Sequence, residues 1–270
     1  MKRGILLLLF ALLCGLPARA ELGIALAPMR IEIQLPPEGQ YTDSLRLTND
    51  AAAAVRIRSE LLDWFIDETM TPQFADRYEQ ERDFSCRDWL QLNPREMDMV
   101  PNGTFRVRYT LRVPKETPQG EYHCGAGFVT LPPLTPGQPA MGMNIAVRAV
   151  AAFYVVVGNP ASGPALRDLS LRSASDGSWE AVAQFENQGL RHYRIQGFVE
   201  VVDANGQVVE RDEYPSIPVL PRRVQAFPIR LKQALSPGTY VLRSEADVGL
   251  PEILEASTRL VVEALAADKQ

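Results

Sequence analysis

The chain is poor in the residues with which most enzymes perform chemistry. It has two histidines, His123 and His192, and three cysteines in 270 residues. It also lacks the Gly-x-Ser-x-Gly elbow of serine hydrolases, a phosphate-binding glycine loop and the His-Glu-x-x-His motif of zinc proteases. The usual catalytic constellations are therefore excluded, and we expect neither an enzyme nor a bound cofactor or metal.

Two weaker chemical signals remain. Asp63 and Asp67 form a pair of carboxylates, which we interpret as exposed loop charges. A metal site through His123 and Cys124 is disfavoured because neighbouring residues of a strand point to opposite faces. Binding is therefore a better hypothesis than catalysis.

No segment is apolar over the ~20 residues that a membrane helix needs. The N-terminus instead resembles a signal peptide, residues 1–20, with Lys2 and Arg3 before an apolar run from Ile5 to Leu16 and a small-residue cleavage site at Ala18-Arg19-Ala20. We expect export to the periplasm, a mature chain that begins near Glu21, and no integral membrane segment in it.

The charge of this mature chain argues against polyanionic partners. Cleavage lowers the basic count from 28 to 25 against 33 acidic residues, which gives a net charge of −8. Nucleic acid and anionic lipid are therefore excluded as general partners.

Export changes the interpretation of the cysteines. Cleavage removes Cys14 and leaves Cys86 and Cys124, an even pair in a compartment that permits disulfides. We predict that they form a disulfide; two buried free thiols are the alternative.

Strand patterns dominate both halves of the chain. Phe105, Val107, Tyr109, Leu111 and Val113 alternate with polar residues, which predicts a half-buried strand. The second half repeats this pattern at 179–185 and 195–202, followed by a hairpin turn at Asn205-Gly206. We expect an all-β fold of two immunoglobulin-like β-sandwich domains in tandem, at 21–158 and 164–264, separated by a glycine- and proline-rich break.

A repeated turn supports the tandem arrangement. Pro118-Gln-Gly-Glu-Tyr122 and Pro237-Gly-Thr-Tyr240 each carry a tyrosine at the start of the predicted penultimate strand. We expect Tyr122 and Tyr240 to form tyrosine corners, in which the hydroxyl hydrogen-bonds back across the junction between two strands.

Two charge patterns remain ambiguous at this point. The segment from Asp67 to Arg87 is rich in charge, and we interpret it as a solvated excursion that the disulfide restrains. The stripe Arg106, Arg108 and Arg112 could receive an acidic partner or could be an ordinary solvated sheet face. Arg46 on an adjoining strand would repel it unless acidic neighbours intervene.

The apolar run Met141–Val157 is the strongest functional signal. Only Asn144 and Arg148 are strongly polar among the fifteen residues after Gly142. Such a strand must be covered, either by the protein's own sheets, as in an ordinary buried strand, or by another protein.

This run and three other segments resemble one family. The signal peptide, the strand Pro28-Met-Arg-Ile-Glu-Ile33, the strand ending Leu-Arg-Leu-Thr-Asn49 and the strand Asn144–Tyr154 are similar to those of the PapD-like chaperones of chaperone-usher pilus assembly. The resemblance implies a periplasmic chaperone that lends a strand to a pilus-type subunit, its client. It also implies an outer-membrane usher as a further partner.

The resemblance assigns roles to individual residues. The donor side chains would be Met143, Ile145 and Val147, with Met141 extending the row. Arg30 matches the first of two basic residues that bind the client's terminal carboxylate in the family. The family's second basic residue falls on Ala151 or Ala152, so that half of the anchor is missing.

A second function remains open. A secreted or cell-surface immunoglobulin-like scaffold or adhesion protein, without chaperone activity, fits the same two sandwiches. The missing basic residue favours this alternative, and an usher gene beside this one would favour the chaperone.

Overall fold

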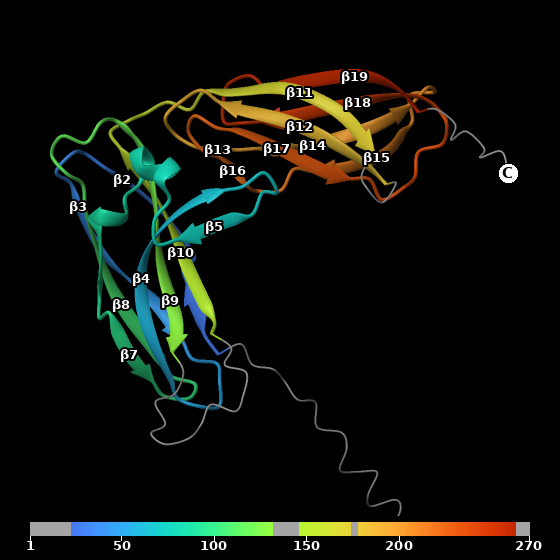
Figure 1. Ribbon diagram of the computed structural model, residues 1–270. Helices are drawn as coiled ribbons and strands as arrows, with labels where there is room; N and C mark the ends of the chain where they lie inside the picture. Colours follow the sequence, from blue (N-terminus) through green and yellow to red (C-terminus); the bar gives the residue numbers. More distant parts are fainter. Residues whose placement is uncertain (1–22, 132–145, 174–177, 263–270) are drawn as a thin grey trace, which may run out of the picture.

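The computed structural model describes residues 23–131, 146–173 and 178–262. The described chain forms two immunoglobulin-like β-sandwiches whose long directions differ, so that the molecule has an angular outline (Figure 1). The predicted all-β fold class is confirmed. The strand β10 ends at Val157 and β11 begins at Pro164, and the domain limits 21–158 and 164–264 stay predictions.

The first sandwich contains ten strands and two short 3₁₀ turns in the described part of the chain. They are β1 (Ala25–Ala27), β2 (Arg30–Leu35), β3 (Gln40–Thr48), β4 (Val55–Ile66), β5 (Pro72–Ala75), η1 (Glu79–Phe84), η2 (Arg87–Trp89), β6 (Leu90–Asn93), β7 (Glu96–Met99), β8 (Thr104–Arg112), β9 (Gly120–Leu131) and β10 (Arg148–Val157).

These strands form two facing sheets. One has the order β1-β3-β8-β6 and the other β2-β10-β9-β4-β5, with β7 beside β4. Two sheets ordered ABED and GFC define the immunoglobulin arrangement, which this sandwich matches with β3 as strand B and β10 as strand G. The opening segment divides at Pro28, because β1 pairs with β3 in one sheet and β2 pairs with β10 in the other.

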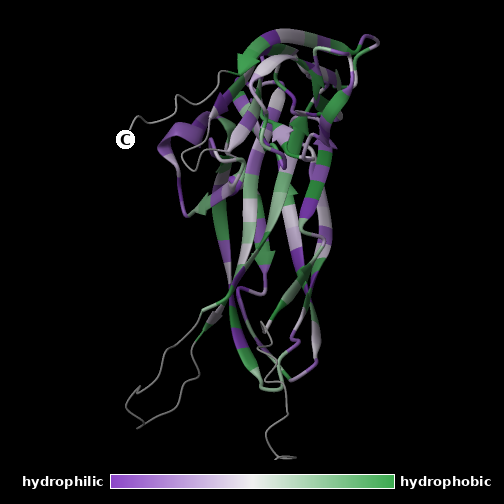
Figure 2. Ribbon diagram, turned by 90° about the vertical axis from the view of Figure 1, so that its right-hand side faces the viewer, coloured by the Kyte–Doolittle hydropathy of each residue, from purple (hydrophilic) through white to green (hydrophobic). Residues whose placement is uncertain are grey.

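Alternation of apolar and polar residues accounts for these strands. In β8, Val107, Tyr109 and Leu111 are buried while Arg106 and Arg108 are exposed, as the period of two predicts. Bands of hydrophobic and hydrophilic residues alternate along many of the strands in Figure 2. Because the apolar side chains of both sheets face inward, they form one continuous core from Ile24 to Val157.

The second sandwich has its own core. Its strands are β11 (Pro164–Ser173), β12 (Trp179–Asn187), β13 (Tyr193–Arg194), β14 (Gln196–Asp203), β15 (Val208–Glu213), β16 (Pro218–Val219), β17 (Val224–Arg230), β18 (Gly238–Asp247) and β19 (Leu254–Val262). They form the sheets β11-β12-β17 and β15-β14-β18-β19 and the short pair β13-β16. The predicted hairpin turn joins β14 to β15, with Gly206 N donating to Asp203 O at 3.1 Å.

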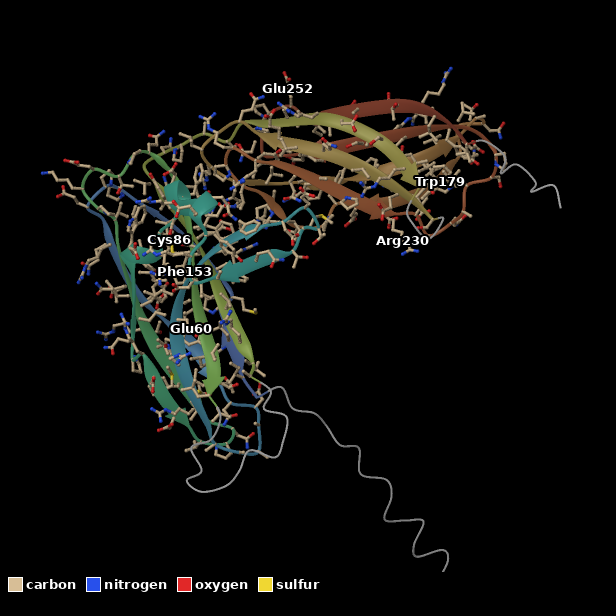
Figure 3. The ribbon with its side chains drawn as sticks, in the orientation of Figure 1. Glu60, Cys86, Phe153, Trp179, Arg230 and Glu252 are labelled. Carbon is tan, nitrogen blue, oxygen red and sulfur yellow. A yellow bond between two sulfur atoms is a disulfide. The ribbon has the colours of Figure 1, made fainter. Side chains whose placement is uncertain are left out.

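The predicted disulfide joins Cys86, just before η2, to Cys124 in β9. Both residues are fully buried, and Cys124 lies opposite Phe153 of β10 in the sheet. Figure 3 labels Cys86 and Phe153 in the part of the first sandwich nearest the second one. The bond therefore ties the charged excursion to the central strands.

The excursion itself is more ordered than the sequence predicts. β5 pairs with β4, and Glu81 in η1 is buried beside Arg223 of the second sandwich, with which it forms an ion pair. Asp63 is also buried: its carboxylate accepts hydrogen bonds from Ser85 Oγ at 2.5 Å and Tyr78 N at 3.2 Å. The interpretation of exposed charge at Asp63 was wrong, because its carboxylate finds partners within the fold. Most charged residues of the excursion are exposed, as a solvated segment predicts, and Glu81 is the buried exception.

Both tyrosines make the predicted corner hydrogen bond. Tyr122 OH donates to Pro118 O and Tyr240 OH donates to Ser236 O, each at 2.9 Å. The rings close the turns that lead into β9 and β18, so each hydroxyl satisfies a carbonyl at a strand junction.

Replacing Tyr240 with phenylalanine should lower the free energy of unfolding by about 1 kcal/mol, because one partly buried hydrogen bond is lost without a cavity. Urea unfolding followed by tryptophan fluorescence measures the change. Tyr41→Phe is the control, since its exposed hydroxyl reaches only Asp43 at 3.4 Å. Equal losses in both variants would contradict the corner's role.

Among the residues that the structure describes, no helix has the length and apolarity to cross a bilayer. The predicted signal peptide lies outside the described residues.

Candidate binding site: an open strand edge beside a buried charged cluster

One half of β10 has an uncovered edge. β9 pairs with β10 along its whole length, from Arg148 opposite Val129 to Val157 opposite Gly120. On the other side, β2 pairs only from Ala152 onward. Within the described residues, no strand covers that side between Arg148 and Ala151.

The direction of the backbone groups decides what this edge can do. Thr130 N donates to Val147 O at 3.0 Å, and Ala152 N donates to Met29 O at 2.9 Å. Odd-numbered residues of β10 therefore direct their backbone groups to β9, and even-numbered residues direct theirs away from it. It follows that the N–H and C=O groups of Arg148 and Val150 face the open side, where another strand could pair.

The side chains of this segment have two different surroundings. Val147 and Ala149 pack against the margin of the first core and are half-buried. Arg148 points away from that core and forms an ion pair with Glu60 on β4, with Nη2 3.1 Å from Oε2. Figure 3 labels Glu60 on the first sandwich.

Of the predicted donor residues, only Val147 lies in the described part of the chain. Met141, Met143 and Ile145 lie outside the described residues, so their roles stay predictions. Val147 has the inward phase of β10 and packs against the first core.

Arg30, the predicted carboxylate anchor, lies at the start of β2 directly opposite Ala152. Its side chain is 58% exposed, and its Nε is 3.5 Å from Glu32 Oε1. Ala152 is one of the two positions at which the family's second basic residue falls. A second cation nevertheless reaches this place from the other sandwich.

That cation is Arg194 of β13. Its Nη2 lies 3.8 Å from Glu32 Oε1 and 3.5 Å from the hydroxyl of Tyr154, and its guanidinium lies over the Tyr154 ring. His192 Nε2 also lies 3.7 Å from Glu32 Oε1. Glu32 is thus the carboxylate on which Arg30, Arg194 and His192 converge.

Behind this group, Glu121 is buried between the two histidines. Its side chain is 0% exposed; His123 Nε2 and His192 Nδ1 each lie 2.7 Å from one of its oxygens. The backbone N of His192 donates a third hydrogen bond at 3.1 Å. Burial alone would raise the pKa of Glu121, but the hydrogen bonds from His123 and His192 outweigh burial and lower the pKa to about 2.

An apolar contact lies beside this cluster. Trp64 of β4, Tyr154 of β10 and Leu220, just after β16, form a small buried group that joins the two sandwiches. The Trp64 and Tyr154 rings meet edge to face at 5.0 Å. The tip of the β4–β5 hairpin adds a further contact, since Gln225 Nε2 donates to Asp67 O at 3.2 Å.

The sequence does not reveal Arg194 or Glu121 as members of this site. Arg194 is 164 positions from Arg30, and the inter-domain geometry that brings them together has no local signature. The nearest local signal is His192, one of the two histidines of the chain, which lies between Arg191 and Arg194 in the sequence.

Comparisons with known proteins find likeness in structure only. No protein-family model and no curated protein matches the chain in sequence. The YadV chaperone is 13% identical, covering 88% of this chain and 100% of that one, with a TM-score of 0.49. A chain of the CFA/I chaperone–tip adhesin complex is 12% identical over 89% and 99%, with a TM-score of 0.47.

A third similar structure is a complex of a chaperone with a tip subunit, CsuC–CsuE, from the archaic chaperone-usher Csu pili of Acinetobacter baumannii. The matched chain is 12% identical over 86% of this chain and 97% of that one, with a TM-score of 0.46. Because all three TM-scores are below 0.5, we infer function from the strand edge and the cluster beside it.

Proposed function

We propose that this protein is a periplasmic chaperone that binds a pilus-type subunit by adding its own strand to the subunit's sheet. One observation carries the proposal: the backbone groups of Arg148 and Val150 face a side of β10 that no strand covers in the described residues. An unpaired strand edge favours pairing with another chain.

The donor segment would be Met143–Val147, with Met141 extending the row. Burying the side chains of Met143, Ile145 and Val147 in a client's groove could contribute roughly 5–9 kcal/mol before ordering costs, at about 1.5–3 kcal/mol each. Main-chain hydrogen bonds would add affinity that does not depend on the client's sequence.

The client's terminal carboxylate would bind between Arg30 and Arg194. Both guanidinium groups already approach one carboxylate, that of Glu32. A client carboxylate would replace Glu32 there, provided that the Glu32 side chain turns away. Arg194 would thereby supply the second cation that the sequence of β10 lacks.

Transfer of the client to an outer-membrane usher would complete this role. Export through the predicted signal peptide would bring the chain to the compartment where such subunits are assembled.

Replacing Ile145 with aspartate should reduce recovery of a co-expressed pilus-type subunit by about 10–100-fold, because a charge would enter an apolar groove. Co-purification from periplasmic extracts measures it. Val261→Asp is the matched control, since Val261 is an apolar residue of the second sandwich that is 67% exposed. Unchanged recovery with Ile145→Asp would contradict the mechanism.

A cell-surface scaffold or adhesion protein is the second candidate. The observation that favours it is Glu32, which already neutralises Arg30 and Arg194 and leaves no free anchor in this state. A scaffold would bind its partner without releasing it to an usher. Neighbouring genes that encode an usher and subunits would support the chaperone instead.

A further inference from the structure

We propose that the outer face of the β1-β3-β8-β6 sheet binds an acidic protein surface. Four arginines define this arginine face: Arg46 of β3 and Arg106, Arg108 and Arg112 of β8. All four are exposed. The face lies on the opposite side of the sandwich from the strands that flank the open edge, so this proposal goes beyond the chaperone role.

The strand register gathers the arginines. Arg46 lies directly opposite Arg106, and Arg108 lies opposite Ser44 on one side and Asn93 on the other. Arg112 Nε donates to Gln40 Oε1 at 2.9 Å, which holds that guanidinium over the sheet. Four positive charges therefore lie on one face of two neighbouring strands.

Among the described residues, no acidic side chain occupies an outward position of these four strands. The other outward positions of the four strands hold small or uncharged polar residues: Ala25, Ala27, Gln40, Thr42, Ser44, Thr48, Gln91, Asn93, Thr104 and Thr110. Asp43 belongs to the opposite phase of β3, since it pairs with the buried Tyr109. Within the described residues, none of the four arginines forms an ion pair with a carboxylate.

Two outward arginines elsewhere in the chain are neutralised by glutamates on neighbouring strands. Arg172 of β11 reaches Glu180 of β12 at 3.0 Å, and Arg56 of β4 reaches Glu96 of β7 at 2.6 Å. On the arginine face, the corresponding cross-strand partner of Arg106 is another arginine. Like charges directly opposite each other destabilise a sheet, so the uncompensated pair is a cost that a bound carboxylate would remove.

The spacing of the face suits an extended acidic segment. Residues two apart on a strand are separated by about 7 Å, and opposite residues of neighbouring strands by about 5 Å. Carboxylates at alternate positions of an extended chain have the same spacing, and guanidinium groups can bind carboxylates through two parallel hydrogen bonds.

A protein partner fits better than a membrane or nucleic acid. The chain has a net charge of −5, which repels extended polyanions at long range. The outward positions of this sheet hold no large apolar side chain that could enter a bilayer. A local acidic patch on another protein would meet the arginines without facing the rest of the negative surface.

The location leaves the face free while a client is bound. In Figure 1, β3 and β8 form the side of the first sandwich that points away from the second one, whereas β9 and β10 lie on the side nearer to it. An acidic protein could therefore dock without displacing a strand from β10.

The test uses the mature full-length chain and a fluorescent peptide of alternating glutamate and threonine. Fluorescence anisotropy should detect binding at about 0.02 M salt that weakens strongly at about 0.3 M. Arg106→Glu should weaken it about tenfold, because it removes one charge contact and adds a repulsion. Arg259→Glu on β19, an exposed arginine remote in the fold, is the matched control and should leave affinity within about twofold.

Thermal unfolding separates binding from damage to the fold. In the Arg106→Glu variant, a negative charge at position 106 would lie opposite Arg46. The Tm of the variant should therefore rise by roughly 1–4 °C while its affinity for the peptide falls. If the Arg106→Glu variant folds poorly, the uncharged Arg106→Gln variant replaces it in the test and should also bind the peptide more weakly than the parent. Equal losses with Arg106→Glu and Arg259→Glu, or tighter binding to phosphatidylglycerol vesicles or an oligonucleotide than to the peptide, would overturn the proposal.

Discussion

Replacing Arg148 with proline should abolish capture of a pilus-type subunit, with a loss of at least about 100-fold in affinity. Proline removes the backbone N–H that faces the open side of β10, and its ring would meet an incoming strand. The same substitution should leave the fold intact, because the backbone groups of Arg148 do not bond to β9. Surface plasmon resonance with an immobilised client measures the loss.

Arg148→Ala is the matched control for this result. It removes the same side chain and the same exposed ion pair with Glu60, worth about 0–1 kcal/mol, but keeps the N–H group. Its affinity should stay within about fivefold of the parent. If both variants bind equally well, the main chain at this edge does not pair with the client and strand addition is wrong.

Replacing Glu121 with glutamine should remove much of the acid sensitivity of the fold. Its carboxyl pKa falls from 4.5 to about 2 on folding, which corresponds to about 3 kcal/mol of stability. A lowered pKa stabilises the folded state above pH 4.5, and that contribution disappears as the pH falls from 4.5 toward 2. Urea unfolding at a series of pH values should therefore give a flatter profile for Glu121→Gln than for the parent.

The same variant should lose up to about 3 kcal/mol at pH 7, because Glu121 accepts three buried hydrogen bonds. Glu252→Gln removes one negative charge at an exposed position, labelled in Figure 3, and should keep the parent's pH profile. Identical profiles for all three proteins would contradict a depressed pKa at Glu121.

Local patterns in the sequence were sufficient to predict much of the fold. The alternation from Phe105 to Val113 predicts β8 because only period two buries one face of a sheet. Tyr122 and Tyr240 identify strand junctions because each hydroxyl bonds to a carbonyl only four residues earlier in the sequence. The disulfide was predictable because the signal peptide indicates export to a compartment that permits disulfides, and because cleavage leaves two cysteines.

The parts that escaped prediction depend on long-range placement. Most charges of the excursion are exposed, but Glu81 is buried because it pairs with Arg223 of the second sandwich, far away in the sequence. Arg194 was missed for the same reason. Such partners become visible only once the relative position of the two domains is known.

The division of the opening segment at Pro28 has a consequence for any strand that adds to β10. Because β2 begins at Arg30 and its pairing with β10 begins when Ala152 N bonds to Met29 O, an incoming strand on that side must end where Met29 stands. The start of β2 therefore sets the register of the added strand. The end of the added chain lies beside Arg30, and the number of residues of β10 before that point determines which residues of the two strands lie opposite each other.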